Sequence, residues 1–471
     1  MKELAKRGHE ITFFSPFPET EPIKNFKTIV LTGLFEERNQ FMSTFNPLQL
    51  NNNFVLLELL ILSSITSKAM EQTLAHEKLQ ALLRSGEKFD IVLAESFIYD
   101  GLLVIGHQLN VPYGLISCVG PSIWTNHLLG APDIPSYMTS VPVKPPVHIS
   151  FGKRLHNFLI YGLGKLFEIT YSYPKQNAII KKYFPDAPHI NDIIHNTSLI
   201  LFNSDNSFNQ PIPTTPNSVE IGGFHVRPPK KLPEDLQKIL DNAKHGVVYF
   251  SLGSIMKSSL IPVDKRQEIL RAFSKLKQIV LWKYEEKLSN LPSNVITKSW
   301  FPQSDLLAHP NVKVFITHGG VLSTIESLYR GVPVIGIPIF SDQEMNMVNA
   351  VNHGHGLMIT YSELCEETLS DALKEVLTNP KYTNNVKYSS KVLKDQLVDP
   401  IDKAEYWIKY VVRHKGAKHL RLASMDLTWY QHISLDVILF LTAVTVILFY
   451  VFYRIIKWLI GRRKSKKQKV N

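Results

Sequence analysis

Residues 315–343 read FITHGGVLSTIESLYRGVPVIGIPIFSDQ, and this stretch decides the fold of the chain. An apolar strand predicted over 312–316 runs into His318 and a glycine pair, and a helix-like segment follows at once. Gly319 and Gly320 let the backbone approach a ligand closely, and a helix N-terminus there offers free N–H groups and the positive end of a dipole. The stretch therefore predicts an anion-binding loop within an α/β sheet, with His318 as a further hydrogen-bond donor.

A second apolar strand is predicted over 332–339, and it is followed by Asp342 and Gln343. An acid and an amide are suited to sugar hydroxyls, because together they accept and donate several hydrogen bonds. A sugar donor that carries a diphosphate fits the two strand ends together. An ordinary strand–loop–helix–strand unit would explain the hydrophobic pattern, but not the polar residues that close successive strands.

The composition is that of a large globular protein. With 471 residues, 44% of them hydrophobic and 20% charged, the chain is long enough for two or more domains with sizeable cores. Its two cysteines, Cys118 and Cys365, are far apart and form neither a metal-binding nor a redox spacing. We therefore expect no disulfide scaffold and no metal site.

The formal net charge of +11 is concentrated at the C-terminus. The last eighteen residues, 454–471, contain eight lysines and arginines and no acid, so the rest of the chain is close to balanced. A basic face on a folded body would suggest nucleic acid, whereas a short basic tail does not. We expect no nucleic-acid partner.

The basic tail follows the most apolar segment of the chain. Residues 437–453, VILFLTAVTVILFYVFY, are 17 residues without a charge or a helix breaker, which is the lower end of the length that spans a bilayer. Trp429 and Tyr430 before it and Trp458 after it resemble interfacial anchors. A buried core helix is the alternative, and the basic flank argues against it. We predict one transmembrane helix over 435–456, in contact with membrane lipid.

The charge distribution also predicts an orientation. The positive-inside rule places the basic tail, 457–471, in the cytosol and the body on the lumenal side. Lys467 and Lys469 stand fifth and third from the end, as in the dilysine retrieval signal of endoplasmic-reticulum membrane proteins. Asn196 begins an Asn-Thr-Ser glycosylation sequon. We therefore expect a single-pass protein of the endoplasmic-reticulum membrane, glycosylated at Asn196.

The N-terminus does not match a lumenal body. Residues 1–7 have no apolar signal-peptide core and read as the end of an amphipathic helix, closed by Gly8 and followed by a strand over 10–14. Such a chain begins halfway through a βαβ unit, without the strand that should precede the helix. We expect an N-terminally truncated chain or an incomplete gene model.

The remaining sequence predicts two α/β domains. In the first half, 54–84 and 101–109 have helical patterns, 89–94, 112–117 and 198–203 read as strands, and the proline-rich 132–146 predicts loops near a binding cleft. We divide the chain into a first domain over 1–222, a linker over 223–244, a second domain over 245–400, and a returning helix with a juxtamembrane segment over 401–434.

Further polar residues follow strands of the second domain. Ser254 lies in a Ser-Leu-Gly-Ser turn after a strand over 247–251, and a lone turn of this kind is unspecific. In the Trp-Phe-Pro-Gln segment, Trp300 can stack on a planar base while Gln303 bonds a nucleoside, although a core tryptophan is an equal alternative. Because ligands of open α/β sheets bind beyond the carboxyl ends of the strands, these residues can converge.

The stretch 315–343 is similar to the signature of the UDP-glycosyltransferase (UDP-glucuronosyltransferase) family, and the resemblance runs from residue 1 through the membrane helix. The segments 413–421 and 426–429 are typical of its membrane-bound animal members, and the chain most resembles an insect enzyme. The resemblance implies a GT-B fold, with two Rossmann-like domains facing a cleft. The first domain would bind a lipophilic acceptor and the second a UDP-sugar, which is a co-substrate and leaves no need for a cofactor.

The resemblance also assigns roles to the donor-site residues. For the nucleoside, it implies that Trp300 stacks on uracil, Gln303 contacts the nucleoside and Glu326 accepts from the ribose hydroxyls. For the diphosphate, it implies that Ser254 and His318 bind it together with N–H groups near Gly320 and Ser323. Asp342 and Gln343 would contact the sugar. One position departs from the family pattern. Leu322 stands where vertebrate members often have asparagine, so Ser323 is expected to supply the polar contact.

The mechanism that the family implies is direct displacement with inversion at the anomeric carbon. A histidine general base takes the proton of the acceptor hydroxyl, and an acid orients that histidine. By register Glu95 is the acid, where vertebrate and plant members carry aspartate. Asp100 is the alternative acid, unless it caps a helix. The histidine follows the first strand in the family, and no histidine of this chain matches its motif.

Two hypotheses follow from this pattern. The first is an enzyme that transfers a glycosyl group, from UDP-glucose rather than UDP-glucuronate, to a hydroxyl of a small lipophilic acceptor. The second is a non-catalytic donor-binding or partner protein, which would form homo- or hetero-oligomers with related enzymes.

Overall fold

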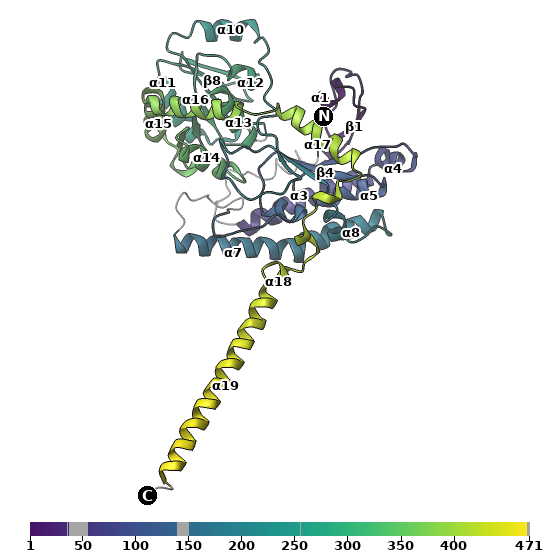
Figure 1. The fold of residues 1–471 in the computed structure, drawn as a ribbon. Coiled ribbons are helices and arrows are strands. Elements are labelled where there is room, and N and C mark those ends of the chain that lie inside the picture. The colour runs from purple at the N-terminus through teal and green to yellow at the C-terminus, as the bar shows by residue number, and fades with distance from the viewer. Residues whose placement is uncertain (35, 37–54, 139–149, 255, 469–471) are drawn as a thin grey trace. The chain divides into compact units, whose positions relative to one another are not determined.

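The computed structural model describes residues 1–34, 36, 55–138, 150–254 and 256–468 (Figure 1). The chain forms two compact units, Met1–Leu420 and Arg421–Asn471. Part of the proline-rich segment predicted over 132–146 and Lys469 of the dilysine motif lie outside the described residues. The larger unit contains three parallel sheets and the smaller one consists of helices.

The second half of the larger unit is built on a six-stranded parallel sheet. Its order is β12 (Gly356–Met358), β11 (Val334–Gly336), β10 (Val312–Thr317), β7 (Val247–Ser251), β8 (Ile279–Lys283) and β9 (Val295–Lys298). In chain order this arrangement reads 6-5-4-1-2-3, as in a doubly wound dinucleotide-binding fold. The strand order reverses between β7 and β10, so a ligand is expected beyond the carboxyl ends of these two strands.

Helices cover both faces of this sheet, which explains its continuous apolar strands. On one face α11 (Val263–Ser274) and α15 (Glu366–Thr378) pack against residues such as Phe250 and Trp282. On the other face α10 (Glu234–Asp241), α12 (Gln303–Leu306) and α14 (Gln343–Asn352) pack against Tyr249 and Phe315. The remaining helices of this half are α13 (Val321–Arg330) and α16 (Pro380–Lys394), which pack together.

The first half of the larger unit has two separate parallel sheets. Four strands pair in the order β3 (Val92–Glu95), β4 (Tyr113–Ser117), β5 (Leu199–Phe202) and β6 (Ser218–Glu220). A further pair, β1 (Ile11–Ser15) and β2 (Phe26–Val30), forms its own sheet. Within the described residues neither β1 nor β3 has a strand partner on its second edge.

Helices from both ends of the chain enclose the four-stranded sheet. One face is covered by α3 (Val55–Ala75), α4 (Glu77–Arg84), α8 (Tyr173–Tyr183) and α9 (Ile190–Ile194). The other face is covered by α1 (Lys2–Lys6) and by α17 (Pro400–Arg413), which returns to this half after the second sheet is complete. Arg7 joins the two, because its guanidinium donates to Glu405 at 2.7 Å.

Several elements differ from their predicted extents, and three of the differences have a local cause. The helix expected over 54–84 is two helices, with His76 capping the second of them. The strand expected over 332–339 is only three residues long, because Pro333 and Pro338 have no N–H for a ladder. The helix expected over 101–109 begins with a 3₁₀ turn, Asp100–Leu103, and continues as α5 (Val104–Gln108).

The smaller unit contains α18 (Trp429–His432) and the long helix α19 (Leu435–Gln468). The segment Leu435–Arg462, 28 residues long, is long and apolar enough to cross a membrane, and none of it is buried against other described residues. The exposure of its apolar side chains disfavours the alternative of a buried core helix. The candidate span is longer than the predicted 435–456, and helical structure continues into the basic tail.

Candidate functional site

The carboxyl ends of β7 and β10 lie side by side, and glycines follow both of them. Ser251 and Thr317 are paired at the ends of the two strands. An added Cβ at Gly253 would lie 2.6 Å from the His318 ring, and one at Gly320 would also lie 2.6 Å from it. Only glycine therefore fits on either side of this imidazole, and the two turns close around it.

His318 is held as a neutral imidazole with an unused nitrogen. Burial, followed by the charge of Lys283, lowers the pKa of His318 to about 4. Its Nδ1 atom is buried and has no hydrogen-bond partner among the described residues. Beside it α13 begins at Gly320, whose cap position has no side-chain hydrogen bond. The free N–H groups of this first turn and the imidazole form a setting for an anion.

A polar network links the loop after β9 to α13. The Gln303 Nε2 atom donates to Ser323 Oγ at 3.1 Å and to Glu326 Oε2 at 2.7 Å. The Tyr249 hydroxyl donates to Gln303 Oε1 at 3.3 Å. Burial raises the pKa of Glu326, while its hydrogen bond to Gln303 opposes that shift. The three predicted residues Gln303, Ser323 and Glu326 are thus brought together.

Trp300 and Ser254 are both on the surface. Trp300 has 65% of its side chain exposed, with the Lys283 ammonium 5.9 Å from its ring centroid. The alternative of a core tryptophan is therefore wrong; the buried tryptophan of this sheet is Trp282. Ser254 is exposed in the turn after β7. An exposed aromatic ring at a strand end is available for stacking on a planar group.

Asp342 and Gln343 lie at the start of α14. Burial raises the pKa of Asp342, and the Asn346 Nδ2 atom donates to Asp342 Oδ2 at 2.6 Å. The Gln343 side chain is buried, and its Oε1 atom accepts from the Ile339 N–H at 2.9 Å. Gln343 therefore has its amide nitrogen, rather than this oxygen, to offer a ligand.

Sequence reasoning missed Asn346 and Glu58. The same Asn346 nitrogen donates to Gly319 O at 2.9 Å, so it joins the sugar end of the candidate site to its anion loop. Its position four residues after Asp342 on a helix was an available signal. Glu58 of α3 lies near the Ser341 N–H and near Asp342: burial raises the pKa of Glu58, the Ser341 N–H opposes that rise, and the charge of Asp342 adds to it. Nothing in the local pattern around Glu58 indicates this contact.

Glu95, from the first half of the chain, lies near Cys118, as Asp342 of the second half does. It ends β3, is exposed, and accepts from the Tyr99 hydroxyl at 2.8 Å. Burial, then the charges of Glu95 and Asp342, raises the pKa of Cys118 to about 11. Because the charges of both carboxyl groups raise the pKa of this one thiol, Glu95 and Asp342 both lie near Cys118.

Asp100 lies elsewhere. It is buried as the first residue of a 3₁₀ turn that Tyr99 precedes, so the expectation that it caps a helix is wrong. Burial, followed by the charge of Glu168, raises the pKa of Asp100 to about 7. Asp100 therefore belongs to an interior polar cluster. Of the two predicted acids, Glu95 is the exposed one.

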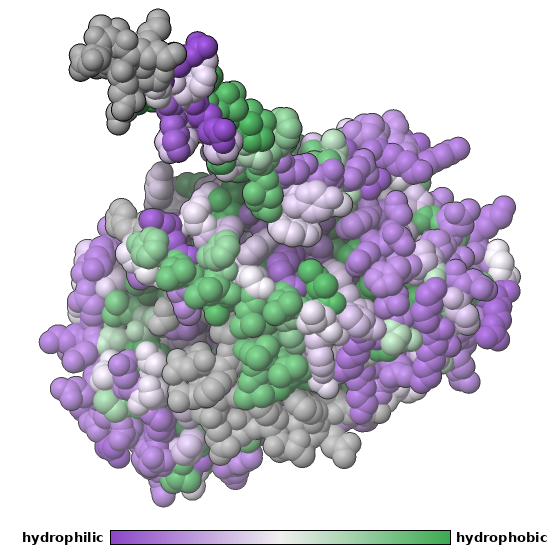
Figure 2. All heavy atoms as spheres, turned by 90° about the horizontal axis from the view of Figure 1, so that it is seen from below, coloured by the Kyte–Doolittle hydropathy of each residue, from purple (hydrophilic) through white to green (hydrophobic). Residues whose placement is uncertain are grey.

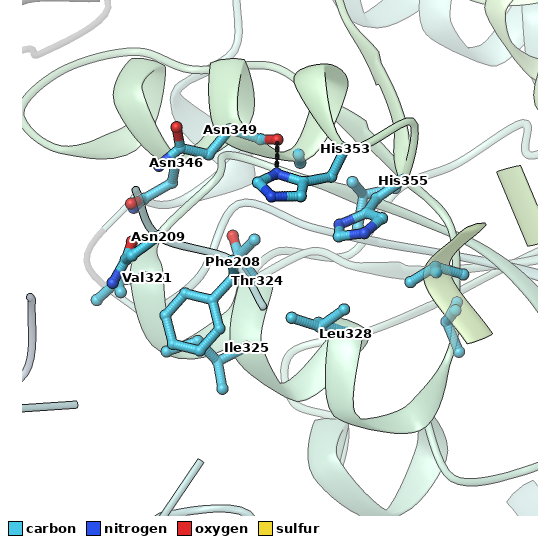
Figure 3. Close-up of a pocket in the computed structure, with 14 residues that line it drawn as sticks. Phe208, Asn209, Val321, Thr324, Ile325, Leu328, Asn346, Asn349, His353 and His355 are labelled. Carbon is cyan, nitrogen blue, oxygen red and sulfur yellow. Dashed lines mark hydrogen bonds between the residues drawn. The ribbon is translucent and has the colours of Figure 1, made fainter. Parts of the chain in front are cut away.

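A small cavity adjoins the candidate site, because Val321 and Asn346 are among the residues that line it. This cavity behind α13, lined by residues that include Phe208, Ile325, His353 and His355, has a volume of about 20 Å³ (Figure 3). That volume holds about one water molecule, so the cavity is too small for a nucleotide sugar. Asn196 is exposed, and its amide donates to Asp192 O at 2.8 Å. Among the described residues no three His, Cys, Asp or Glu side chains are placed to hold a metal ion.

Known proteins resemble this chain over its whole length. The family model described as "UDP-glucoronosyl and UDP-glucosyl transferase" matches residues 2–470. UDP-glycosyltransferase UGT5 of Dactylopius coccus is 35% identical over 459 residues, covering 96% of this chain and 86% of that protein. UDP-glucuronosyltransferase 2C1 of Oryctolagus cuniculus is 34% identical over 469 residues, covering 95% and 92%.

Solved structures show the same fold. CalG4, the calicheamicin glycosyltransferase, has a TM-score of 0.59 at 17% identity, covering 88% of this chain and 93% of that one. A UDP-glucosyltransferase from Polygonum tinctorium has a TM-score of 0.56 at 16% identity, covering 87% and 94%. The prediction of a GT-B fold is confirmed. The chain belongs to the UDP-glucuronosyl and UDP-glucosyl transferase family, whose members transfer a sugar from a UDP-sugar to an acceptor.

Proposed function

We propose that this protein transfers a neutral hexose, glucose rather than glucuronic acid, from its UDP-sugar to a hydroxyl of a small lipophilic acceptor, with inversion. The observation that carries the choice of sugar is the set of carboxyl groups near Ser341. Asp342 lies at the start of α14, Glu58 lies near Ser341 and Asp342, and the charges of both Glu95 and Asp342 raise the pKa of Cys118. Relatives of both kinds, glucosyl and glucuronosyl transferases, leave the choice open.

The physical argument is one of like charges. A glucuronate brings a carboxylate to the sugar subsite, where it would meet the fields of Asp342 and Glu58 in a partly desolvated place. A glucose hydroxyl in the same position carries no charge and can donate to either acid. The acids therefore disfavour the uronate and accept the neutral sugar.

The donor is held as its chemistry requires. The exposed Trp300 ring stacks on uracil, Gln303 bonds the nucleoside and Glu326 accepts from the ribose hydroxyls. The diphosphate lies at the first turn of α13, where Ser254, His318 and the N–H groups near Gly320 and Ser323 donate to it. Asp342 and Gln343 bond the sugar, with Asn346 fixing the Asp342 carboxylate.

The transfer itself forms one bond and breaks one. The acceptor oxygen attacks the anomeric carbon as the bond from that carbon to the diphosphate oxygen breaks, and UDP leaves with the negative charge. The acceptor hydroxyl also loses a proton, and because no described histidine bonds Glu95, the exposed Glu95 carboxylate itself is the group proposed to take it. His318 and the N–H groups of α13 stabilise the negative charge that develops on the leaving diphosphate, which lowers the activation barrier of the transfer.

The second candidate is a donor-binding protein without turnover. The observation that favours it is the partner of Glu95, which is the Tyr99 hydroxyl, while no described histidine bonds this carboxylate. In this case the chain binds UDP-sugars through the same residues and associates with related enzymes.

We place the protein in the endoplasmic-reticulum membrane, with its body lumenal and its basic tail cytosolic. The support is the candidate span Leu435–Arg462 followed by a segment rich in lysine and arginine. Glycosylation of the exposed Asn196 belongs to the same proposal. Two measurements test this topology: protection of the body from protease in intact microsomes, and removal by endoglycosidase of a glycan attached to Asn196.

The decisive experiment separates donor binding from transfer. The full chain in detergent micelles is titrated with UDP-glucose and UDP-glucuronate by calorimetry, and each donor is then offered with a panel of phenols and steroids. We expect tighter binding of UDP-glucose and formation of a glucoside detected by mass spectrometry. Preferred use of UDP-glucuronate overturns the choice of sugar. Binding without any product supports the second candidate.

A further inference from the structure

The helix α7 (Phe151–Phe167) has its apolar residues on the outside. Together with the π-helical turn Glu168–Ser172 it runs continuously into α8. Five large apolar side chains of this segment are more than half exposed: Phe151, Phe158, Leu159, Leu166 and Ile169. Leu155 and Leu163 are exposed as well. Their spacing of three or four residues places them on one face of the helix.

The inward face of the same helix carries hydrogen-bonded polar groups. Asn157 is buried, and its amide donates to Met138 O at 2.6 Å. The Lys165 ammonium donates to Ile123 O at 2.9 Å and to Glu168 Oε2 at 3.0 Å. The Tyr173 hydroxyl donates to Glu168 Oε1 at 3.2 Å. Asn157, Lys165 and Glu168 are therefore bonded on the inward side, whereas Lys153, Arg154 and His156 are exposed beside the apolar stripe.

The exposed apolar stripe is unlike the outer face of a water-facing surface helix. Such a helix turns its apolar stripe to the core and its charges to the solvent, because that removes apolar area from water. A contiguous apolar stripe on the outside instead marks a surface that meets a partner or a membrane. Figure 2, seen from the side on which α7 lies in Figure 1, shows apolar side chains gathered across the middle of the body.

We propose that the outward face of α7 lies in the interface of the lipid bilayer, as a second membrane contact besides the candidate span. The reach of the chain supports a bilayer as the occupant. Only the residues 421–434 separate the larger unit from the start of α19. Fourteen residues extend to at most about 50 Å, so a chain anchored by α19 keeps its body at the membrane.

The charges around the stripe fit a lipid surface. Residues 150–183 contain six lysines and arginines and a single acid, Glu168, which is buried. Lys165 pairs with this acid and Lys182 with Glu71, so the net positive charge of the segment rests on the other four basic residues. Arg154 lies over the Phe151 ring at 5.9 Å and Lys175 over the Tyr171 ring at 5.6 Å. Aromatic rings with basic groups beside them suit the level of the headgroups, where long basic side chains reach lipid phosphates.

Photolabelling from the lipid tests this contact on the unaltered full chain. The protein is reconstituted in phosphatidylcholine and phosphatidylserine vesicles that contain a phosphatidylcholine with a photoreactive acyl chain, and labelled peptides are mapped by mass spectrometry. We expect label on peptides of α7 as well as on those of α19. A peptide of α16, which carries the exposed Tyr388 and Val392, provides the background.

Charge substitutions sharpen the result. In a variant with Leu159→Glu and Leu166→Glu, we expect the label on α7 to fall to the α16 background while the label on α19 stays unchanged. The matched control, Tyr388→Glu with Val392→Glu, should leave both labels as they were. Binding of UDP, measured by calorimetry in both variants, shows that the body remains folded, and it does not depend on turnover.

Two outcomes overturn the proposal. In the first, α7 of the unaltered chain carries no more label than α16 although α19 is labelled. In the second, α7 is cross-linked to α7 of another copy of the chain at dilute protein-to-lipid ratios, which identifies a dimer as the occupant of this face.

Discussion

The amide of Asn346 donates to the Asp342 carboxylate at 2.6 Å and, from the same nitrogen, to the Gly319 carbonyl at 2.9 Å. One side chain on α14 thus fixes both the acid at the sugar end and the glycine loop at the phosphate end. Because Asp342 is buried, this hydrogen bond also offsets part of the rise in its pKa.

We predict that Asn346→Ala weakens donor use more than it weakens folding. A hydrogen bond to a charged group contributes about 1.5–3 kcal/mol, so kcat/KM for the donor should fall by about 10–100-fold. Steady-state kinetics with varied UDP-glucose measure this loss. The control is Asn349→Ala on the same helix, whose backbone carbonyl rather than its side chain bonds His353. Equal losses in both variants would refute a positioning role for Asn346.

Trp300 and Trp282 offer a contrast between stacking and packing. Stacking of a base on an aromatic ring contributes about 1–3 kcal/mol, so Trp300→Ala should weaken UDP binding by about 5–150-fold without a change in melting temperature. Trp300→Phe should restore most of the affinity. Trp282 is fully buried, and Trp282→Ala should lower the melting temperature instead. Unchanged UDP affinity in Trp300→Ala would exclude this ring from the donor site.

Glu58 should control the choice between neutral and acidic sugars. In Glu58→Lys the repulsion of a uronate is replaced by attraction, and a difference of about 1.4 kcal/mol changes the ratio of kcat/KM values for UDP-glucuronate and UDP-glucose tenfold. Competition between the two donors in one reaction measures the ratio. Glu87→Lys, at an exposed position after α4, is the matched change of charge. A ratio unchanged by Glu58→Lys would remove the carboxylate argument.

His355 should make stability depend on pH. Burial, then the charge of His353, lowers its pKa to about 4, and its Nε2 atom lies 2.8 Å from Ser389 Oγ. Because the folded pKa lies below the unfolded value near 6.5, the contribution to stability is complete above pH 6.5 and is lost as the pH falls toward 4. We expect this loss to be on the order of 3 kcal/mol. Urea unfolding of the wild type and His355→Gln at several pH values measures it.

The matched control for this prediction is His156→Gln, at an exposed position of α7. It should keep the pH dependence of the wild type. A slope that stays the same in His355→Gln would show that other groups carry the acid sensitivity of this fold.

Local patterns predicted a donor site, and the structure brings several of the predicted residues together. Gln303, Ser323 and Glu326 were predicted from their places after strands and on a helix, and the structure joins them by hydrogen bonds. Strand ends of a parallel sheet meet at one edge, so the order of motifs along the chain already implies their convergence. The positive φ of Gly253 and Gly319 likewise follows from the need for glycine in tight turns.

Other features required the packing of distant segments. Glu58 reaches Ser341 from a helix nearly three hundred residues away in the chain, and no periodicity records that contact. Asp100 and Glu95 are only five residues apart in the chain. Asp100 is nevertheless buried near Glu168, whereas Glu95 is exposed at the end of β3. The exposure of the apolar face of α7 is also invisible to a pattern, because periodicity shows a stripe but not the side that faces inward.

By itself the sequence determined the family, the parallel α/β architecture and the candidate membrane span, and it predicted the donor-site side chains. These depend on hydrophobic periodicity and on glycines and polar residues at fixed offsets, which are local properties of the chain. Only the tertiary structure decided that Trp300 is exposed, that Asn346 bonds both Asp342 and Gly319, and that Glu58 lies near Asp342. Burial and contact depend on which remote segments pack together. The hydrophobic effect that drives this packing is non-directional, so a local sequence pattern does not specify which segments meet.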